Sequence, residues 1–299
     1  MLECPADNKR SFLGESSVCW SIPPTSARGV HGISPDGRGA HLQSTYLVMM
    51  YGMYLSAEGA NAQAKRLEFV ANNLANVETP GFKRDVPTFQ ARFAEAIQQG
   101  QATPGDESVN DVGGGVKLME VNVDFSRATF RQTGIPTDFA VNGEGFFRVQ
   151  DAKGQEFLTR AGDFELDATG QMKTQGGQFS VLDNSGKLIK LDPQLPWDLL
   201  AGGNINQADA QIPIGLTTPE SLGDLVKVGN NVFRSLGPTS VVPSQLRDIR
   251  QGYLEQSGVS SIREMNVMIE TTRAFEANTQ LIQHQDSMVG SLISKVLTA

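Results

Sequence analysis

The chain has 299 residues, a formal net charge of −8 and 39% hydrophobic residues, which is enough for a sizeable core in one or two domains. The acidic balance argues against binding to nucleic acid or to an anionic membrane surface, because both attract basic surfaces. Cys4 and Cys19 are the only cysteines, and His284 is the only histidine from residue 50 onward. The body of the chain therefore lacks the usual residues for a zinc site, thiol catalysis or histidine acid–base chemistry.

Residues 1–49 mix Pro, Gly, Ser and Arg without apolar periodicity, which predicts a disordered extension. Four acidic and four basic residues cancel within it, so the whole net charge lies on residues 50–299. A second interpretation is that the extension is not translated and that the protein starts at Met50. The apolar stretch 46–55, followed by Ala-Asn-Ala at 60–62, resembles a signal peptide but has no concentrated positive charge before it.

A stripe of apolar and small residues predicts a first helix over residues 51–77. From Met53 to Leu74 the Met, Ala and Leu residues of the stripe recur in alternating steps of four and three, the repeat of a coiled-coil seam. Pro80 and Gly81 follow and end the helix, because proline cannot continue it and glycine accepts a positive φ. We expect an N-terminal unit over residues 50–84 that consists of this helix and the motif at its end.

The end of this helix is unusually rich in amides. Three asparagines stand between positions 71 and 77, although asparagine is a mediocre helix former. We expect these amides to hydrogen-bond partner chains at the helix flank and to set register, as buried asparagine does in coiled coils. After the turn, Phe82 is expected to anchor in an apolar pocket, whereas Lys83 and Arg84 are expected to remain in water.

Residues 85–134 are expected to form an extended connector, with a flexible loop at 98–116. Residues 135–250 predict an antiparallel β domain, because short alternating segments are separated there by Gly, Asn and Asp. The sequences Asp-Ala-Thr-Gly at 167–170 and Asp-Asn-Ser-Gly at 183–186 predict hairpin turns, since Asp, Asn and Gly supply the required backbone angles.

The final segment, residues 251–299, predicts one long helix. Its expected N-cap is Ser260 or Ser261, with Glu264 placed to complete a capping box. Apolar residues recur at every seventh position over residues 268–296, and a helix of about 38 residues would span roughly 57 Å. One interpretation is a helix packed on its own domain; the other is that both terminal stripes meet each other and further copies of the chain. The expected fold class is α+β, with coiled-coil-like paired terminal helices around a central antiparallel all-β domain.

The sequence predicts no catalytic site, no cofactor and no metal site. Asn-Gly-Glu-Gly-Phe-Phe at 142–147 lacks the third glycine of a dinucleotide fingerprint and is typical of a tight β turn. Asp163, Glu165 and Asp167 alternate along one strand face. Carboxylate pairs of this kind can act in glycoside hydrolysis, but an exposed strand face is the favoured interpretation.

Three blocks of sequence resemble, in chain order, the bacterial flagellar rod and hook proteins. NNLANVETPGFKR (72–84) resembles the amino-terminal motif of that family. DFAVNGEGFFRV (138–149) and FLTRAGDFELDATGQMKTQGG (157–177) are similar to its central β region, and GYLEQSGVSSIREMNVMIETTRAFEANTQLIQHQD (252–286) to its carboxy-terminal helix. Without a large insert in the β region, the chain is more similar to the FlgF/FlgG-like basal-body rod proteins than to the hook protein.

This resemblance implies a structural axial subunit of the flagellar basal-body rod, the drive shaft that transmits motor torque to the hook across the periplasm. It implies self-association, contacts with other rod and hook axial proteins, and export by the flagellar type III apparatus without a cleaved signal peptide. It implies neither nucleic-acid binding nor direct membrane insertion. Proximal, FlgF-like and distal, FlgG-like positions stay open, with a slight preference for the proximal type.

Two other classes of protein remain as alternatives at this point. A secreted β-rich carbohydrate-active or adhesive protein would require processing after Ala62. A soluble export chaperone or adaptor is disfavoured, because such a protein needs no large β domain.

The terminal helices are expected to bury their apolar stripes in the assembly and to be mobile before it. Burial of ~10 medium apolar side chains at ~1.5–3 kcal/mol each would gain of order 20 kcal/mol before the ordering entropy is subtracted. The expected assembly-interface residues are Leu67, Val70, Asn72, Asn73, Leu74, Asn76, Val77, Pro80, Gly81, Phe82, Met268, Phe275, Leu281, Ile282, Val289, Leu292 and Val296.

Overall fold

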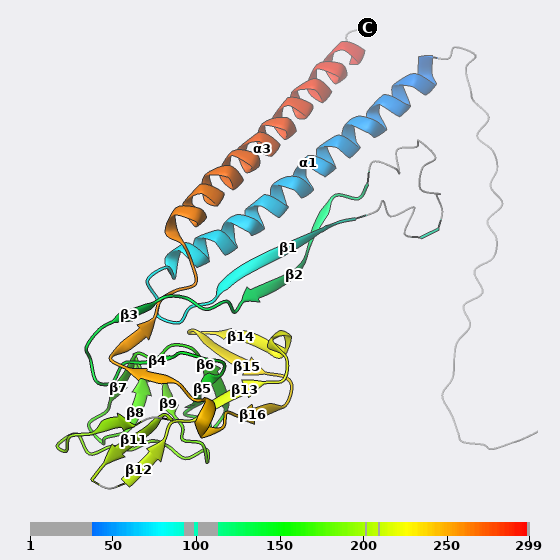
Figure 1. Ribbon diagram of the computed structural model, residues 1–299. Coiled ribbons are helices and arrows are strands. Elements are labelled where there is room, and N and C mark those ends of the chain that lie inside the picture. The colour runs from blue at the N-terminus through cyan, green and yellow to red at the C-terminus, as the bar shows by residue number, and fades with distance from the viewer. Residues whose placement is uncertain (1–37, 93–98, 101–112, 201, 209, 298–299) are drawn as a thin grey trace, which may run out of the picture. The chain divides into compact units, whose positions relative to one another are not determined.

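The computed structural model describes residues 38–92, 99–100, 113–200, 202–208 and 210–297 (Figure 1). Contacts divide the chain into two units, residues 1–44 and 45–299, and the second contains every contact considered below. No helix among the described residues combines the length and the apolar character that a membrane crossing requires.

Two long helices lie at the two ends of the described chain. Helix α1 spans Arg38–Ala75 and helix α3 spans Ser261–Leu297. Helix α1 thus begins well before the predicted start at Tyr51, because residues 40–51 contain no proline or glycine to stop it. The prediction of disorder is therefore wrong for residues 38–49, and the rest of that segment lies outside the described residues.

A two-stranded antiparallel ribbon follows α1, where the sequence predicted only an extended connector. Strand β1 (Arg84–Ala91) pairs with β2 (Val116–Asp124) from Arg84 opposite Asp124 to Ala91 opposite Val116. The register shifts between Thr88 and Phe89, so the ribbon carries a bulge. Most of the loop predicted at 98–116 lies outside the described residues.

The strands that come after the ribbon and before α3 in the sequence all form antiparallel pairs. This confirms the α+β class and the antiparallel β domain. The largest sheet has nine strands, in the order β14-β15-β6-β5-β9-β8-β7, with β13 pairing both β5 and β16. Three smaller sheets are β10-β11-β12, β17-β4 and β18-β3. The strands are β3 (Phe130–Gln132), β4 (Phe139–Val141), β5 (Phe146–Asp151), β6 (Glu156–Thr159), β7 (Phe164–Leu166), β8 (Met172–Thr174), β9 (Phe179–Val181), β10 (Asp198–Leu200), β11 (Asn204–Gln207), β12 (Ala210–Pro213), β13 (Leu216–Pro219), β14 (Leu225–Gly229), β15 (Val232–Ser235), β16 (Thr239–Val241), β17 (Ile249–Gln251) and β18 (Tyr253–Glu255), with short 3-10 helices η2 (Leu222–Asp224) and η3 (Ser244–Leu246).

Alternation along strand β5 divides the apolar residues between two cores. Phe147 and Val149 join the larger core, which also contains Phe139 and Phe164. Phe146 joins a smaller cluster with Leu158, Leu225 and Phe233, against which Val123 and Phe125 pack. Because successive side chains of a strand point to opposite faces, the smaller cluster lies on the other face and fastens the end of β2 to the β domain.

Both predicted hairpin turns are present. Gly170 N–H donates to the carbonyl of Asp167 at 2.7 Å, between β7 and β8. Gly186 N–H donates to the carbonyl of Asp183 at 3.2 Å. The two glycines have φ values of 75° and 79°, the left-handed conformation that favours glycine.

Candidate functional site: the junction at the end of helix α1

The turn after α1 is held against the β domain at a position that only glycine fits. Gly81 has φ of 65°, and its N–H donates to the carbonyl of Glu255 at 2.8 Å. A Cβ added at Gly81 would lie 2.4 Å from the carbonyl carbon of Arg160. The backbones of the turn and of the β domain therefore touch here, and any side chain at Gly81 would force them apart.

Phe82 anchors the turn, as the sequence predicted, although its pocket is not purely apolar. The ring is 3% exposed, and the ammonium of Lys227 lies 3.8 Å from the ring centroid. The carbonyl of Phe82 accepts from Gly258 N–H at 2.9 Å. The ring thus packs under a cation of strand β14, in the geometry of a cation–π contact.

The prediction that Lys83 stays in water is wrong, because this lysine is 1% exposed. Its Nζ donates to Glu255 Oε1 at 2.7 Å and to the carbonyl of Ser126 at 2.9 Å. Glu255 is itself buried, and its Oε2 lies 3.5 Å from Nη1 of Arg160. A buried carboxylate therefore joins two cations from distant parts of the chain.

Burial and pairing oppose each other in this cluster. Burial lowers the pKa of Lys83, and the charge and hydrogen bond of Glu255 raise it again without fully compensating. Burial likewise lowers the pKa of Arg160. Removing one partner of such a cluster leaves an uncompensated buried charge, so the segments that carry these side chains are strongly held together.

Arg84 is also paired rather than free in water. Its Nε lies 2.6 Å from Oε1 of Glu264, a residue of the first turn of α3 that is fully buried. Helix α3 begins at Ser261, close to the expected position, but Glu264 bonds to Arg84 where the sequence predicted a capping box. The contact joins the start of α3 to the start of β1.

The amides at the end of α1 are used within the subunit. Asn73 is 1% exposed; its Nδ2 donates to the carbonyl of Asp85 at 2.9 Å, and its Oδ1 accepts from Asp85 N–H at 3.0 Å. Asn72 Nδ2 donates to Asp85 Oδ2 at 3.1 Å. The amide of Asn73 therefore has its bonds inside the chain, and the expectation that it bonds to another subunit is replaced by a role in fixing β1 to α1.

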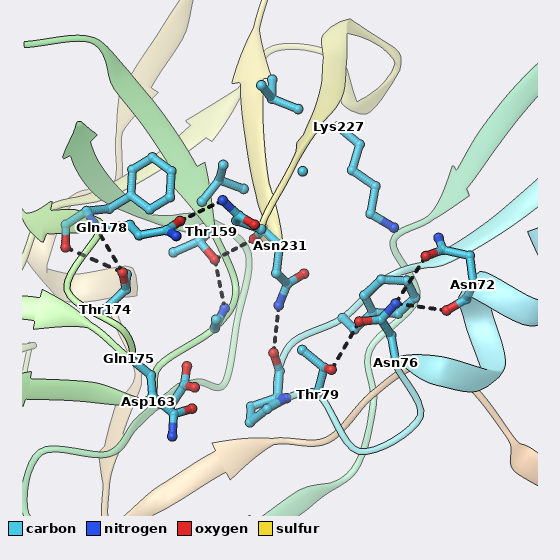
Figure 2. Close-up of a pocket in the computed structure, with 18 residues that line it drawn as sticks. Asn72, Asn76, Thr79, Thr159, Asp163, Thr174, Gln175, Gln178, Lys227 and Asn231 are labelled. Carbon is cyan, nitrogen blue, oxygen red and sulfur yellow. Dashed lines mark hydrogen bonds between the residues drawn. The ribbon is translucent and has the colours of Figure 1, made fainter. Parts of the chain in front are cut away.

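Lys227 completes this attachment from the β domain. Its Nζ lies 3.0 Å from both carboxylate oxygens of Asp85 and 3.0 Å from the carbonyl of Lys83. Asn231 Nδ2 donates to the carbonyl of Pro80 at 2.7 Å. Lys227 of β14 and Asn231, between β14 and β15, thus bind this segment through their side chains. Figure 2 shows the hydrogen bond of Asn231.

A groove of about 600 Å³ lies beside the turn, bordered by the turn, by the end of α1 and by five β strands. Figure 2 shows Asn72 and Asn76 on one side of it and Gln175 and Gln178 on the other. Asn76 Nδ2 donates to the carbonyl of Asn72 at 2.8 Å. Half of the lining residues carry an amide or a hydroxyl group, and the lining contains no catalytic pair. No cluster of His, Cys, Asp or Glu able to hold a metal is found among the described residues.

Asp163 lines this groove and carries a perturbed carboxyl group. Burial raises its pKa to about 6, and the carboxylates of Asp138 and Glu165 add to the effect. Glu165 is exposed, so the predicted exposed strand face holds for Glu165 but not for the half-buried Asp163.

The other residues expected at the assembly interface lie along the two helices. Val70 is 3% exposed and Leu281 is 49% exposed. The side chain of Val296 is outside the described part of the chain. The half-buried members are Leu67, Leu74, Val77, Met268, Phe275, Ile282, Val289 and Leu292.

The sequence did not indicate four residues that hold the junction together. They are Asp85, Arg160, Lys227 and Glu255, and each is charged. Glu255 and Arg160 stand inside the blocks that resemble the rod family. Local sequence spacing does not reveal such contacts, since Glu255, for example, bonds to a lysine 172 positions away.

Comparisons with known proteins match the same three blocks. A model described as "Flagella basal body rod protein" matches residues 53–83. The "Flagellar hook protein FlgE/F/G D1 domain" matches residues 140–216. The "Flagellar basal body rod FlgEFG protein C-terminal" matches residues 250–295. The matched ranges contain Gly81, Arg160 and Glu255, so each block contributes to the junction.

Full-length relatives agree with these matches. The flagellar basal-body rod protein FlgF of Caulobacter vibrioides is 32% identical over 249 residues, which cover 82% of this chain and 97% of the relative. FlgG of Bacillus subtilis is 30% identical over 263 residues, covering 82% and 99%. FlgG of Agrobacterium fabrum is 30% identical over 270 residues, covering 83% and 100%. The alternative of a secreted carbohydrate-active or adhesive protein finds no support, and the chain belongs to the flagellar basal-body rod protein family as a structural subunit of the rod.

Proposed function

We propose that this rod subunit polymerises through α1 and α3, which pair as a coiled coil and pack against the same helices of neighbouring copies. The observation that carries the proposal is a set of large apolar side chains left in solvent along α3. Ile269 is 52% exposed, Leu281 49% and Met288 47%, and Leu281 and Met288 lie seven residues apart and therefore on one face of the helix. Large apolar side chains that share an exposed face of a soluble protein are typical of an interaction site.

The spacing of the covered residues of α3 supports the pairing. One row of buried or half-buried residues recurs in steps of four and three, the periodicity of a coiled-coil seam, and polar and apolar types alternate along it as far as Val289. The row consists of Glu264, Met268, Thr271, Phe275, Asn278, Ile282, Gln285, Val289 and Leu292, and Val267, Thr272, Ala274 and Thr279 are half-buried as well.

The junction supports a role in carrying torque to the hook. The buried charges at Lys83 and Glu255 and the glycine contact at Gly81 tie the helices to the β domain at several points. A joint with so many simultaneous contacts resists bending, which a shaft subunit needs if force on the helices is to reach the β domain.

Family membership supports a location in the basal body and assembly with other rod and hook axial proteins. We also propose export by the flagellar type III apparatus without cleavage, and neither nucleic-acid binding nor membrane insertion. Mass spectrometry of the subunit from purified basal bodies tests the uncleaved export: peptides upstream of Ala62 are expected, and their complete absence would contradict it.

Serine substitutions test the assembly surface. Leu281→Ser combined with Met288→Ser should abolish incorporation into basal bodies, because the substitutions remove apolar contacts between copies. The unfolding free energy of the monomer should change by less than about 0.5 kcal/mol, since both side chains are already exposed. The matched control is Leu236→Ser, which alters a 67% exposed leucine of the β domain and should leave incorporation intact. Equal loss in both variants, or none in the helix variant, would contradict assembly through α3.

A further inference from the structure

Two glycines interrupt helix α1 at positions where the helix gains nothing from them. Gly52 and Gly59 lie seven residues apart, and glycine in a helix interior is less favourable than alanine. A helix that forms a coiled-coil seam would favour alanine at these positions, unless the space left by the glycine is needed for packing.

The space left by each glycine is filled by an amide of α3. A Cβ added at Gly52 would lie 3.0 Å from Nε2 of Gln285, and a Cβ added at Gly59 would lie 3.2 Å from Nδ2 of Asn278. Moving seven residues forward on α1 corresponds to moving seven residues back on α3. The same contact is therefore made twice, about 10.5 Å apart along two antiparallel helices.

These contacts lie far from the junction; beside them, outside the helix pair, the hydroxyl of Tyr51 donates to the carbonyl of Gly113. At the other end of the pair, Glu264 bonds to Arg84 and Asn73 bonds to Asp85. Near the glycines the apolar members of the α3 seam, Ile282 and Val289, are only half-buried. The amide side chains of α3 add to this thin apolar cover, since a glycine on α1 leaves room for them.

We propose that Asn278 and Gln285 are positioning residues that hold the distal halves of α1 and α3 together. Their amides fill the space left by Gly59 and Gly52, and these two contacts together form a clasp between the helices. This inference rests on the proposed pairing of the two helices and identifies what sets their closeness. Within the described residues Oε1 of Gln285 is enclosed and has no hydrogen-bond partner, which is unfavourable for a buried polar atom.

Spin-label distances in the full chain test the clasp, with Cys4 and Cys19 replaced by serine. One pair of labels at Ala57 and Gln280 reports on the distal halves, and a second pair at Ala71 and Asn266 reports on the end near the junction. All four positions are exposed. Gly52→Leu with Gly59→Leu should lengthen the distal distance by roughly 2–5 Å, because each leucine would occupy the space that the amide of Gln285 or Asn278 fills. The distance near the junction should not change.

Two further variants separate the clasp from general damage to a helix. Gly290→Leu, at a helical glycine with nothing within 4 Å of an added Cβ, should leave both distances unchanged. Asn278→Ala with Gln285→Ala, added to the leucine variant, should restore the distal distance by returning the space. An unchanged distal distance with both leucines would overturn the clasp. A broad distal distance in the unsubstituted chain would instead overturn the proposed pairing of the helices.

Discussion

The junction and the distal halves of the helices use opposite kinds of contact. At the junction, Lys83, Glu255 and Glu264 are charged and almost fully buried, with partners drawn from four separate segments. In the distal halves, Leu281 and Met288 are apolar and about half exposed. The side chains thus find their partners within the subunit where the helices meet the β domain, whereas apolar side chains stay exposed in the distal halves. This is the distribution that a building block of a polymer requires.

The two regions should respond differently to substitution. Buried paired charges are costly to disturb in the monomer, whereas exposed apolar residues matter only when another molecule covers them.

Glu255→Gln should have the largest effect. It leaves Lys83 and Arg160 buried without their common anion, and we expect a loss of about 3–5 kcal/mol in unfolding free energy. Denaturant unfolding followed by circular dichroism measures it. The matched control is Glu68→Gln, in an exposed helical pair with Lys65, where the expected loss is below about 1 kcal/mol. Similar losses in both variants would show that the junction charges are not the main attachment.

Asn73→Leu should have the next largest effect. The substitution removes both bonds to the backbone of Asp85 and leaves a buried N–H and C=O unpaired, for an expected loss of about 2–3 kcal/mol. Asn76→Leu removes bonds in an exposed position and should cost less than about 1 kcal/mol. If Asn73→Leu leaves the monomer as stable as the parent but blocks polymerisation, the amide acts between subunits after all.

Asp163→Asn should stabilise the monomer, by a smaller amount. The carboxyl has a raised pKa of about 6 in the folded chain, against about 3.9 when unfolded. The folded state therefore favours the protonated form, and stability falls as the pH rises from about 4 to 6. At pH 7 the asparagine variant should gain about 1–2 kcal/mol, allowing for solvent screening; at pH 4 the gain should vanish.

Asp286→Asn provides the control for this pH dependence, because it makes the same chemical change at an exposed position of α3. It should leave unfolding free energy unchanged at both values of pH. A gain for Asp163→Asn that is equal at pH 4 and pH 7 would indicate improved packing and would contradict the buried carboxylate as its source.

Features encoded by local spacing were accessible from the sequence. The seven-residue repeat predicted α3 almost to its boundaries, and the turns at 167–170 and 183–186 were predicted because Asp and Gly specify their backbone angles. Helix α1 was predicted too short, since its upstream part has no clear stripe. These features depend on neighbours in the chain, which a sequence displays directly.

The junction was not accessible in the same way. Lys83 follows a turn and carries a charge, so water is its expected environment; its burial depends on Glu255, 172 positions later. Asn73 was correctly singled out as unusual, but its partner Asp85 could equally have been a residue of another copy. Long-range pairing of charges decides these environments, and neither residue type nor periodicity reports it.

Amide hydrogen exchange, compared between dilute monomer and assembled rods, tests the central claim most directly. In the monomer, amides of residues 50–60 and 280–297 should exchange faster than those of residues 73–85 and 255–264, because fewer buried side chains hold the distal halves closed. In rods the distal halves should become protected as well. If the distal halves are already as protected in the monomer as the junction, the account is contradicted, because contacts with neighbouring copies would then add no protection.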